Sequence, residues 1–155
     1  MILFYKADGY DGYLSQSYIA PFVAENKTFK TAEHYMMYKK AILFRDEFSA
    51  ESILKQESAE LTRELGRKIK NFDQVIWDKS KYEIVFKANY LKFSQHPELK
   101  KQLLDTGDKL LANADPDDRI WGIGLSESQK ALNRRNWRGD NLLGIALMKV
   151  REALK

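Results

Sequence analysis

An apolar stripe close to the C-terminal end of the sequence is the feature that most constrains the fold. Four apolar residues recur there at intervals of four, three and four: Leu143, Leu147, Val150 and Leu154. This spacing places side chains on one face of an α-helix, and Asp140 or Asn141 is suited to cap its start. The pattern predicts a helix that buries this face in a hydrophobic core.

Further helices are predicted in the first half of the chain. Residues 31–44 have helical patterning, with Thr31 as a suitable N-cap. Ser49 and Ser58 are plausible caps for two shorter helices, the second ending near Gly66. These three segments predict a helical region in the first half of the sequence.

Two more helices are predicted before the final one. Residues 79–93 carry apolar residues at helical spacing. Pro97 suits the first position of the next helix, because proline lacks the backbone donor that would be unpaired there. We expect that helix to stop at Thr106 and Gly107.

Strands are few and short in this interpretation. Residues 2–5 predict one strand, residues 21–24 and 28–30 predict a hairpin, and residues 109–114 predict another strand. The fold class is therefore α+β, predominantly helical, with a few short N-terminal strands. A chain of 155 residues fits one domain, so we expect residues 1–155 to form a single compact domain.

Composition excludes several kinds of chemistry. The chain has no cysteine, which excludes thiol catalysis, disulfides and thiolate metal sites, and its two histidines argue against a histidine-rich metal site. We expect no metal and no cofactor. No apolar run approaches the ~20 residues that span a bilayer, so we expect a cytoplasmic protein without membrane contact. A net charge of +4 does not require a nucleic-acid partner, and we expect a monomer.

Glu33 and Lys40 place a carboxylate and an amine on one face of the helix predicted over residues 31–44. They are seven residues apart, about two turns and ~10 Å of helix rise. Met37 and Phe44 fall on the same stripe, which suggests a cleft wall that binds a polar ligand. The alternative is structural, because Glu33 beside the Thr31 cap complements the helix dipole.

A second candidate cluster follows Asp118. Two glycines in Trp121-Gly122-Ile123-Gly124 would let backbone amides approach a phosphate or sugar. The surrounding pattern is not that of a nucleotide-binding fingerprint, so a turn that needs glycine is the alternative. Asp118 either meets a ligand together with Trp121 or braces this turn.

Three other features allow both functional and structural interpretations. The segment 134–138 interleaves three arginines with Trp137, as a phosphate or base contact would, although a solvated charged segment has the same pattern. Trp77 is typical of a core residue. Arg67, after Gly66, is suited to a phosphate contact or to a structural ion pair.

Taken together and in order, these blocks resemble the NADAR superfamily, also described as YbiA-like N-glycosidases. The resemblance covers residues 14–154 and rests on these blocks, which follow in the expected order: Thr31-Ala32-Glu33-His34-Tyr35 through Lys40-Ala41, Leu65-Gly66-Arg67, Trp77 with Lys79, Lys92-Phe93-Ser94-Gln95, Leu103-Leu104-Asp105-Thr106-Gly107, Asp118 through Gly124, and Trp137 through Gly144 with Ala146-Leu147-Met148 and Arg151.

The resemblance implies a compact, mostly helical α+β domain that hydrolyses N-glycosidic bonds. The known substrates of that family are phosphoribosylamino-pyrimidine intermediates of riboflavin synthesis and ADP-ribose attached to guanine bases. By position, Glu33 and Asp118 would be the acidic catalytic residues, and Lys40, Trp77 and Trp121 would belong to the same pocket.

The remaining candidates would bind substrate through guanidinium, aromatic or amide groups: Arg67, Arg119, Trp137, Arg138, Asn141, Ser15 and Gln16. Leu14-Ser15-Gln16-Ser17-Tyr18 departs from the usual Leu-Ser-Asn-Phe-Tyr, and Met36-Met37 replaces a common Phe-Gln. The altered positions lie where a substrate would be selected, so they affect the choice of substrate more than the chemistry.

Cleavage of a ribosyl C–N bond needs one carboxylate that stabilises the cationic sugar or activates the attacking water. It also needs a second acidic group that protonates the leaving base. Glu33 and Asp118 can supply both, and Lys40 would orient a carboxylate, bind phosphate or form a Schiff base. The predicted function is an N-glycosidase for a small phosphorylated riboside, preferentially from the riboflavin pathway. The alternatives are an ADP-ribosyl-guanine hydrolase acting on nucleic acid and a non-catalytic module that binds ADP-ribose.

Overall fold

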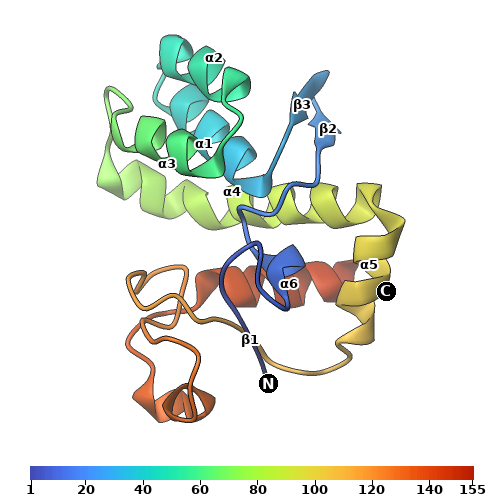
Figure 1. Ribbon diagram of the computed structural model, residues 1–155. Coiled ribbons are helices and arrows are strands. Elements are labelled where there is room, and N and C mark those ends of the chain that lie inside the picture. Colours follow the sequence, from blue (N-terminus) through green and yellow to red (C-terminus); the bar gives the residue numbers. More distant parts are fainter. The chain divides into compact units, whose positions relative to one another are not determined.

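Helices dominate the structure. The computed structural model describes residues 1–155 and contains six α-helices, four three-residue strands and three short 3₁₀ helices (Figure 1). This confirms the predicted α+β, predominantly helical class. The chain divides into two compact units: a central unit, Ile19–Gln95, and a terminal unit, Met1–Tyr18 with His96–Lys155.

The central unit begins with the predicted hairpin. Strand β2 (Phe22–Ala24) pairs antiparallel with β3 (Lys27–Phe29). Glu25 and Asn26 form the tight turn, both with positive φ (54° and 64°), which suits a two-residue hairpin connection.

Helix α1 (Ala32–Leu43) is the centre of this unit. It packs against α2 (Glu47–Lys55), α3 (Ala59–Arg67) and α4 (Gln74–Gln95). Its first seven residues are all buried, because neighbouring elements cover it on several sides.

The starts of the neighbouring helices correct two predictions. Asp46, not Ser49, caps α2: the Asp46 carboxylate accepts a hydrogen bond from the Ser49 amide (3.1 Å), so Ser49 lies inside the helix. Ser58 caps α3 as predicted. Helix α4 begins at Gln74 rather than at residue 79, where the Asp73 carboxylate accepts a hydrogen bond from the Ile76 amide (3.2 Å).

The terminal unit joins segments from both ends of the chain. Strand β1 (Ile2–Phe4) pairs in parallel with β4 (Leu111–Asn113), and α6 (Leu142–Ala153) packs against β4. The unit also contains the short helix η1 (Gly12–Leu14) and helix α5 (Pro97–Asp105).

Helix α6 buries the apolar stripe that the sequence predicts, since Leu143, Leu147, Val150 and Leu154 are all buried. Its start is not capped as predicted. Asn141 lies at the N-cap position with φ 55° and makes no side-chain cap hydrogen bond. None of the six helices combines the length and the apolar composition needed to cross a lipid bilayer.

Candidate active site

Glu33 is a buried carboxylate in the first turn of α1. Its side chain is 6% exposed, and its Oε1 lies 3.5 Å from Nε of Arg63 on α3. Thr31 fixes the start of the helix, because its Oγ1 accepts a hydrogen bond from the His34 amide (3.1 Å). A buried carboxylate needs an opposite charge to offset its lost hydration. Arg63 supplies it.

Lys40 lies two turns further along α1. Its Nζ donates a hydrogen bond to the carbonyl oxygen of Gly66 (3.0 Å). Burial lowers the pKa of the Lys40 amine from its usual 10.5, while the charge of Glu33 opposes this shift and that of Arg67 adds to it. The three charged residues are therefore electrostatically coupled within the central unit.

Two aromatic rings lie beside the Lys40 amine. Its Nζ is 4.8 Å from the ring centroid of Phe72 and 5.4 Å from that of Trp77. Trp77 lies in the first turn of α4 and is buried, as a core residue would be, whereas Phe72 is 42% exposed. Ring faces next to a cation provide cation–π stabilisation and a surface on which a heterocycle can stack.

Gly66 allows α3 to approach α1 closely. A Cβ at this position would lie 2.0 Å from Sδ of Met37. Any larger residue would therefore displace Met37, which lies between Glu33 and Lys40 on α1. The absence of a side chain brings the Gly66 carbonyl within reach of the Lys40 amine.

Arg67 forms the structural ion pair considered in the sequence interpretation, with its Nη1 2.7 Å from Oε1 of Glu64 and both side chains exposed. Arg63 was not among the predicted site residues. The sequence does carry a signal for it, because Arg63 and Arg67 are four residues apart and share a face of α3.

In the terminal unit, Asp118 braces a turn. Its Oδ1 accepts hydrogen bonds from the amides of Ile120 (2.9 Å) and Trp121 (2.8 Å). This is the structural alternative that the sequence left open. The catalytic role of Asp118 stays a prediction, as does the role of Trp121 in binding.

Gly122 and Gly139 lie where two loops come into close contact. A Cβ on Gly139 would lie 2.2 Å from the carbonyl oxygen of Gly122. The same loops are joined by hydrogen bonds from the Asp140 amide to the Arg119 carbonyl (2.9 Å) and from the Arg138 amide to the Ile123 carbonyl (2.8 Å). The need for glycine at this turn is thus steric. The side chains of Arg119 and Arg138 are exposed, and their binding of substrate stays a prediction.

Trp137 and Asn141 have clear structural roles. The Trp137 Nε1 donates a hydrogen bond to the carbonyl oxygen of Ala131 (2.8 Å). The Asn141 side chain accepts a hydrogen bond from the Asn113 amide (2.9 Å) and donates one to the Leu111 carbonyl (3.0 Å), so it ties α6 to β4. The predicted contacts of Trp137 and Asn141 with substrate stay predictions.

Ser15 and Gln16 follow η1 and are both nearly buried, at 8% and 9% exposure. The Ser15 Oγ accepts a hydrogen bond from the Ser17 amide (3.2 Å). No group of three or more His, Cys, Asp or Glu side chains is arranged to hold a metal ion.

The predicted site residues thus form two groups. The central unit brings together Glu33, Lys40, Arg67 and Trp77, joined by Arg63 and Phe72. The terminal unit contains the others: Ser15, Gln16, Asp118, Arg119, Trp121, Trp137, Arg138 and Asn141. That both groups serve one substrate stays a prediction.

Comparison with known proteins identifies the family. The family model described as the NADAR domain matches residues 3–155. The chain belongs to the NADAR family.

Several relatives of this NADAR chain are named N-glycosidases. N-glycosidase R617 of Acanthamoeba polyphaga mimivirus is 49% identical over 124 residues, which cover 79% of this chain and 72% of the relative. N-glycosidase YbiA of Escherichia coli (strain K12) is 31% identical over 154 residues, 99% of this chain and 88% of the relative. The NMR structure of E. coli YbiA matches with a TM-score of 0.82 and 31% identity, over 99% of this chain and 83% of that one.

These similarities confirm the family and the fold class that the sequence predicts. The NADAR model spans residues from both units of the structure. Because relatives that match most of the chain are N-glycosidases, this NADAR protein is an enzyme of the same class, one that hydrolyses N-glycosyl compounds.

Proposed function

We propose that the enzyme hydrolyses the C–N bond of a phosphorylated N-riboside, and that its preferred substrate is an aminopyrimidine riboside phosphate of the riboflavin pathway. The observation that carries this proposal is the buried carboxylate of Glu33, which is paired with Arg63 and shares a helix face with Lys40. A carboxylate shielded from water is suited to stabilise the cationic sugar of such a reaction.

Glu33 acts where positive charge develops. As the C–N bond lengthens, the anomeric carbon becomes cationic and the bonding electrons move to the nitrogen. The Glu33 carboxylate stabilises that carbon or takes a proton from the attacking water. Asp118 is the proposed donor of the proton that leaves with the base. General acid–base assistance of this kind accounts for ~10²–10⁴ in rate.

The neighbouring side chains suit the two ends of such a substrate. The rings of Phe72 and Trp77 offer a stacking surface for the pyrimidine. Arg67, whose ion pair with Glu64 is exposed, can exchange that partner for a phosphate, which guanidinium binds bidentately. The three roles of Lys40 stay open. Its lowered pKa favours the neutral amine that a Schiff base needs.

A second candidate function is hydrolysis of ADP-ribose from guanine in nucleic acid. The observation in its favour is the segment 130–138, which holds four cations and no acidic residue. Several backbone phosphates of a nucleic acid would find partners there. A small riboside phosphate needs only one or two such contacts. The two substrates should therefore differ in how strongly their binding depends on this segment.

Mass spectrometry of the released bases distinguishes the candidates. The enzyme is incubated separately with an aminopyrimidine riboside phosphate and with an ADP-ribosylated oligonucleotide, and kcat/KM is determined for each. Glu33→Gln serves as the background for spontaneous hydrolysis. We expect at least tenfold higher kcat/KM for the small substrate. The reverse preference would move the assignment to nucleic acid, and release from neither would contradict the proposal.

A further inference from the structure

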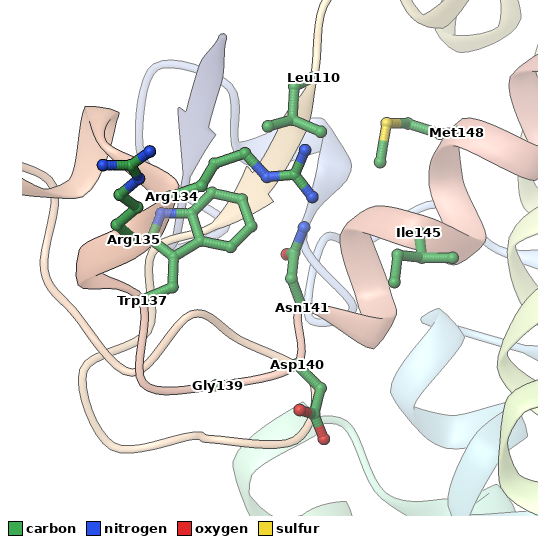
Figure 2. Close-up of a pocket in the computed structure, with 9 residues that line it drawn as sticks. All are labelled: Leu110, Arg134, Arg135, Trp137, Gly139, Asp140, Asn141, Ile145 and Met148. Carbon is green, nitrogen blue, oxygen red and sulfur yellow. The ribbon is translucent and has the colours of Figure 1, made fainter.

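A pocket of about 460 Å³ opens in the terminal unit, beside the start of α6 (Figure 2). Its volume lies in the range of pockets that hold small organic molecules, about 300–1,000 Å³. One side comes from the short helix η3 (Arg134–Asn136) and the residue after it, and the other side comes from α6.

The cations of this pocket have no carboxylate partner. Arg134 and Arg135 both line it, and neither forms an ion pair. In Figure 2 the Arg134 side chain extends over the indole of Trp137 toward Leu110, whereas Arg135 points away from α6. Asp140 also lines the pocket, but its carboxylate points away from Arg134.

Arg134 rests on a fixed platform. Its guanidinium carbon lies 5.5 Å from the ring centroid of Trp137. The indole is held in turn by the hydrogen bond from Nε1 to the Ala131 carbonyl (2.8 Å), and it packs against a buried cluster that includes Ile123. A cation held in this way loses little side-chain entropy when it binds a ligand.

The opposite wall is apolar. Ile145 and Met148 are three residues apart on α6, and Leu110 lies near them in the pocket lining. Ile145 is 37% exposed. Asn141 also lines the pocket, where its amide is bonded to the backbone of β4. The pocket therefore presents an unpaired guanidinium opposite exposed hydrocarbon.

We propose that this pocket binds an organic phosphate with an apolar or aromatic body. Arg134 holds the phosphate, because the planar guanidinium fork matches two phosphate oxygens. The body of the ligand covers Ile145 and Met148, which removes their apolar surface from water. Inorganic phosphate would leave that surface exposed and therefore binds more weakly.

Methionine methyl NMR tests this binding at the pocket itself. The chain has four methionines: Met148 reports on the pocket, and Met37, which lies against Gly66, reports on the candidate active site. The probes are phenyl phosphate, phenol and inorganic phosphate. We expect phenyl phosphate to shift the Met148 signal saturably and to bind at least tenfold more tightly than either of the other two.

Two variants test separately the contact with the phosphate and the contact with the apolar body of the ligand. Arg134→Gln should weaken phenyl phosphate at least about tenfold, since a charged hydrogen bond is lost, and Ile145→Thr should reduce the advantage over inorganic phosphate. Lys101→Gln, which removes an exposed cation of α5 outside the pocket, should change nothing. The Met36 and Met37 signals verify that each variant is folded.

Three outcomes would overturn the proposal. They are equal affinity for phenol, unchanged affinity in Arg134→Gln, and shifts at Met37 without any at Met148. The last result would place the phosphate at the candidate active site instead.

Discussion

Glu33 is one carboxylate among three cations in the central unit. Nε of Arg63 lies 3.5 Å from its Oε1. The Lys40 amine is influenced by the charges of both Glu33 and Arg67. This excess of positive charge suits an anionic substrate, because a phosphate can be bound without displacing Glu33 from its own partner. The sequence predicts the Glu33–Lys40 spacing. It does not predict the Arg63 contact, which depends on how closely α3 approaches α1.

Arg63→Ala should lower kcat roughly tenfold, which corresponds to about 1.4 kcal/mol of transition-state stabilisation. The reason is that Arg63 holds the Glu33 carboxylate in position through the contact between its Nε and Oε1 of Glu33. Because the Arg63 side chain is 44% exposed, added guanidinium ion at millimolar concentration should partly restore kcat in Arg63→Ala. A loss of thermal stability without any rescue would show that Arg63 has only a structural role.

Lys92 gives the stability of the protein a distinctive pH dependence. Burial lowers the pKa of this lysine of α4 from 10.5 to about 7. Between those values the unfolded chain binds a proton that the folded chain does not, so the free energy of unfolding rises with pH. The slope contributed by Lys92 is at most about 1.4 kcal/mol per pH unit.

Urea unfolding at several pH values from 7 to 9.5 measures this dependence. The wild type should gain stability with rising pH, and Lys92→Met, which lacks the amine, should show a flatter curve. Parallel curves for the two proteins would mean that Lys92 keeps its proton when the protein is folded.

Among the elements, helix positions were predicted better than helix starts. Thr31 and Ser58 cap their helices as expected. The prediction that Ser49 caps α2 was wrong because Asp46, three residues earlier, is the N-cap. Both residue types are good N-caps, so local sequence does not decide between them. Asn141 lies at the N-cap position of α6, as predicted, but makes no capping hydrogen bond. Its side chain bonds instead to β4, a contact some 30 residues distant in sequence. The parallel pairing of β1 with β4 is beyond local patterns for the same reason.

The contact between the two loops of the terminal unit predicts a strong effect of Gly139→Ala. The added Cβ would meet the carbonyl oxygen of Gly122 at 2.2 Å, and a backbone atom cannot rotate away. We expect a loss of about 3 kcal/mol or more in the free energy of unfolding. Gly107→Ala is the matched control. Its φ is +60° with no atom within 4 Å, so it should cost only about 1–2 kcal/mol. Equal losses would argue against the tight loop contact.

For the whole molecule, charge bears on the choice of substrate. The net charge is only +4, yet four cations gather in residues 130–138. If the substrate is a small riboside phosphate, KM should rise only modestly between 50 and 200 mM salt. A nucleic-acid substrate would lose affinity steeply, because binding to many phosphates releases counterions.

The measurement is KM against ionic strength for both substrates, in the wild type and in Arg134→Ala/Arg135→Ala. We expect shallow dependence on the small substrate in both proteins. Steep dependence on the oligonucleotide, reduced in the double variant and combined with efficient turnover, would favour the nucleic-acid substrate instead.

The central claim is that the buried carboxylate of Glu33 carries out the hydrolysis of an N-riboside. Its most direct test is base release by Glu33→Gln, measured by mass spectrometry under single-turnover conditions beside the thermal midpoint of the same preparation. Glutamine keeps the size of the side chain and removes its charge. The account predicts that base release falls to the uncatalysed rate while the midpoint stays within a few degrees of the wild type. Near-normal release by the folded variant would contradict it.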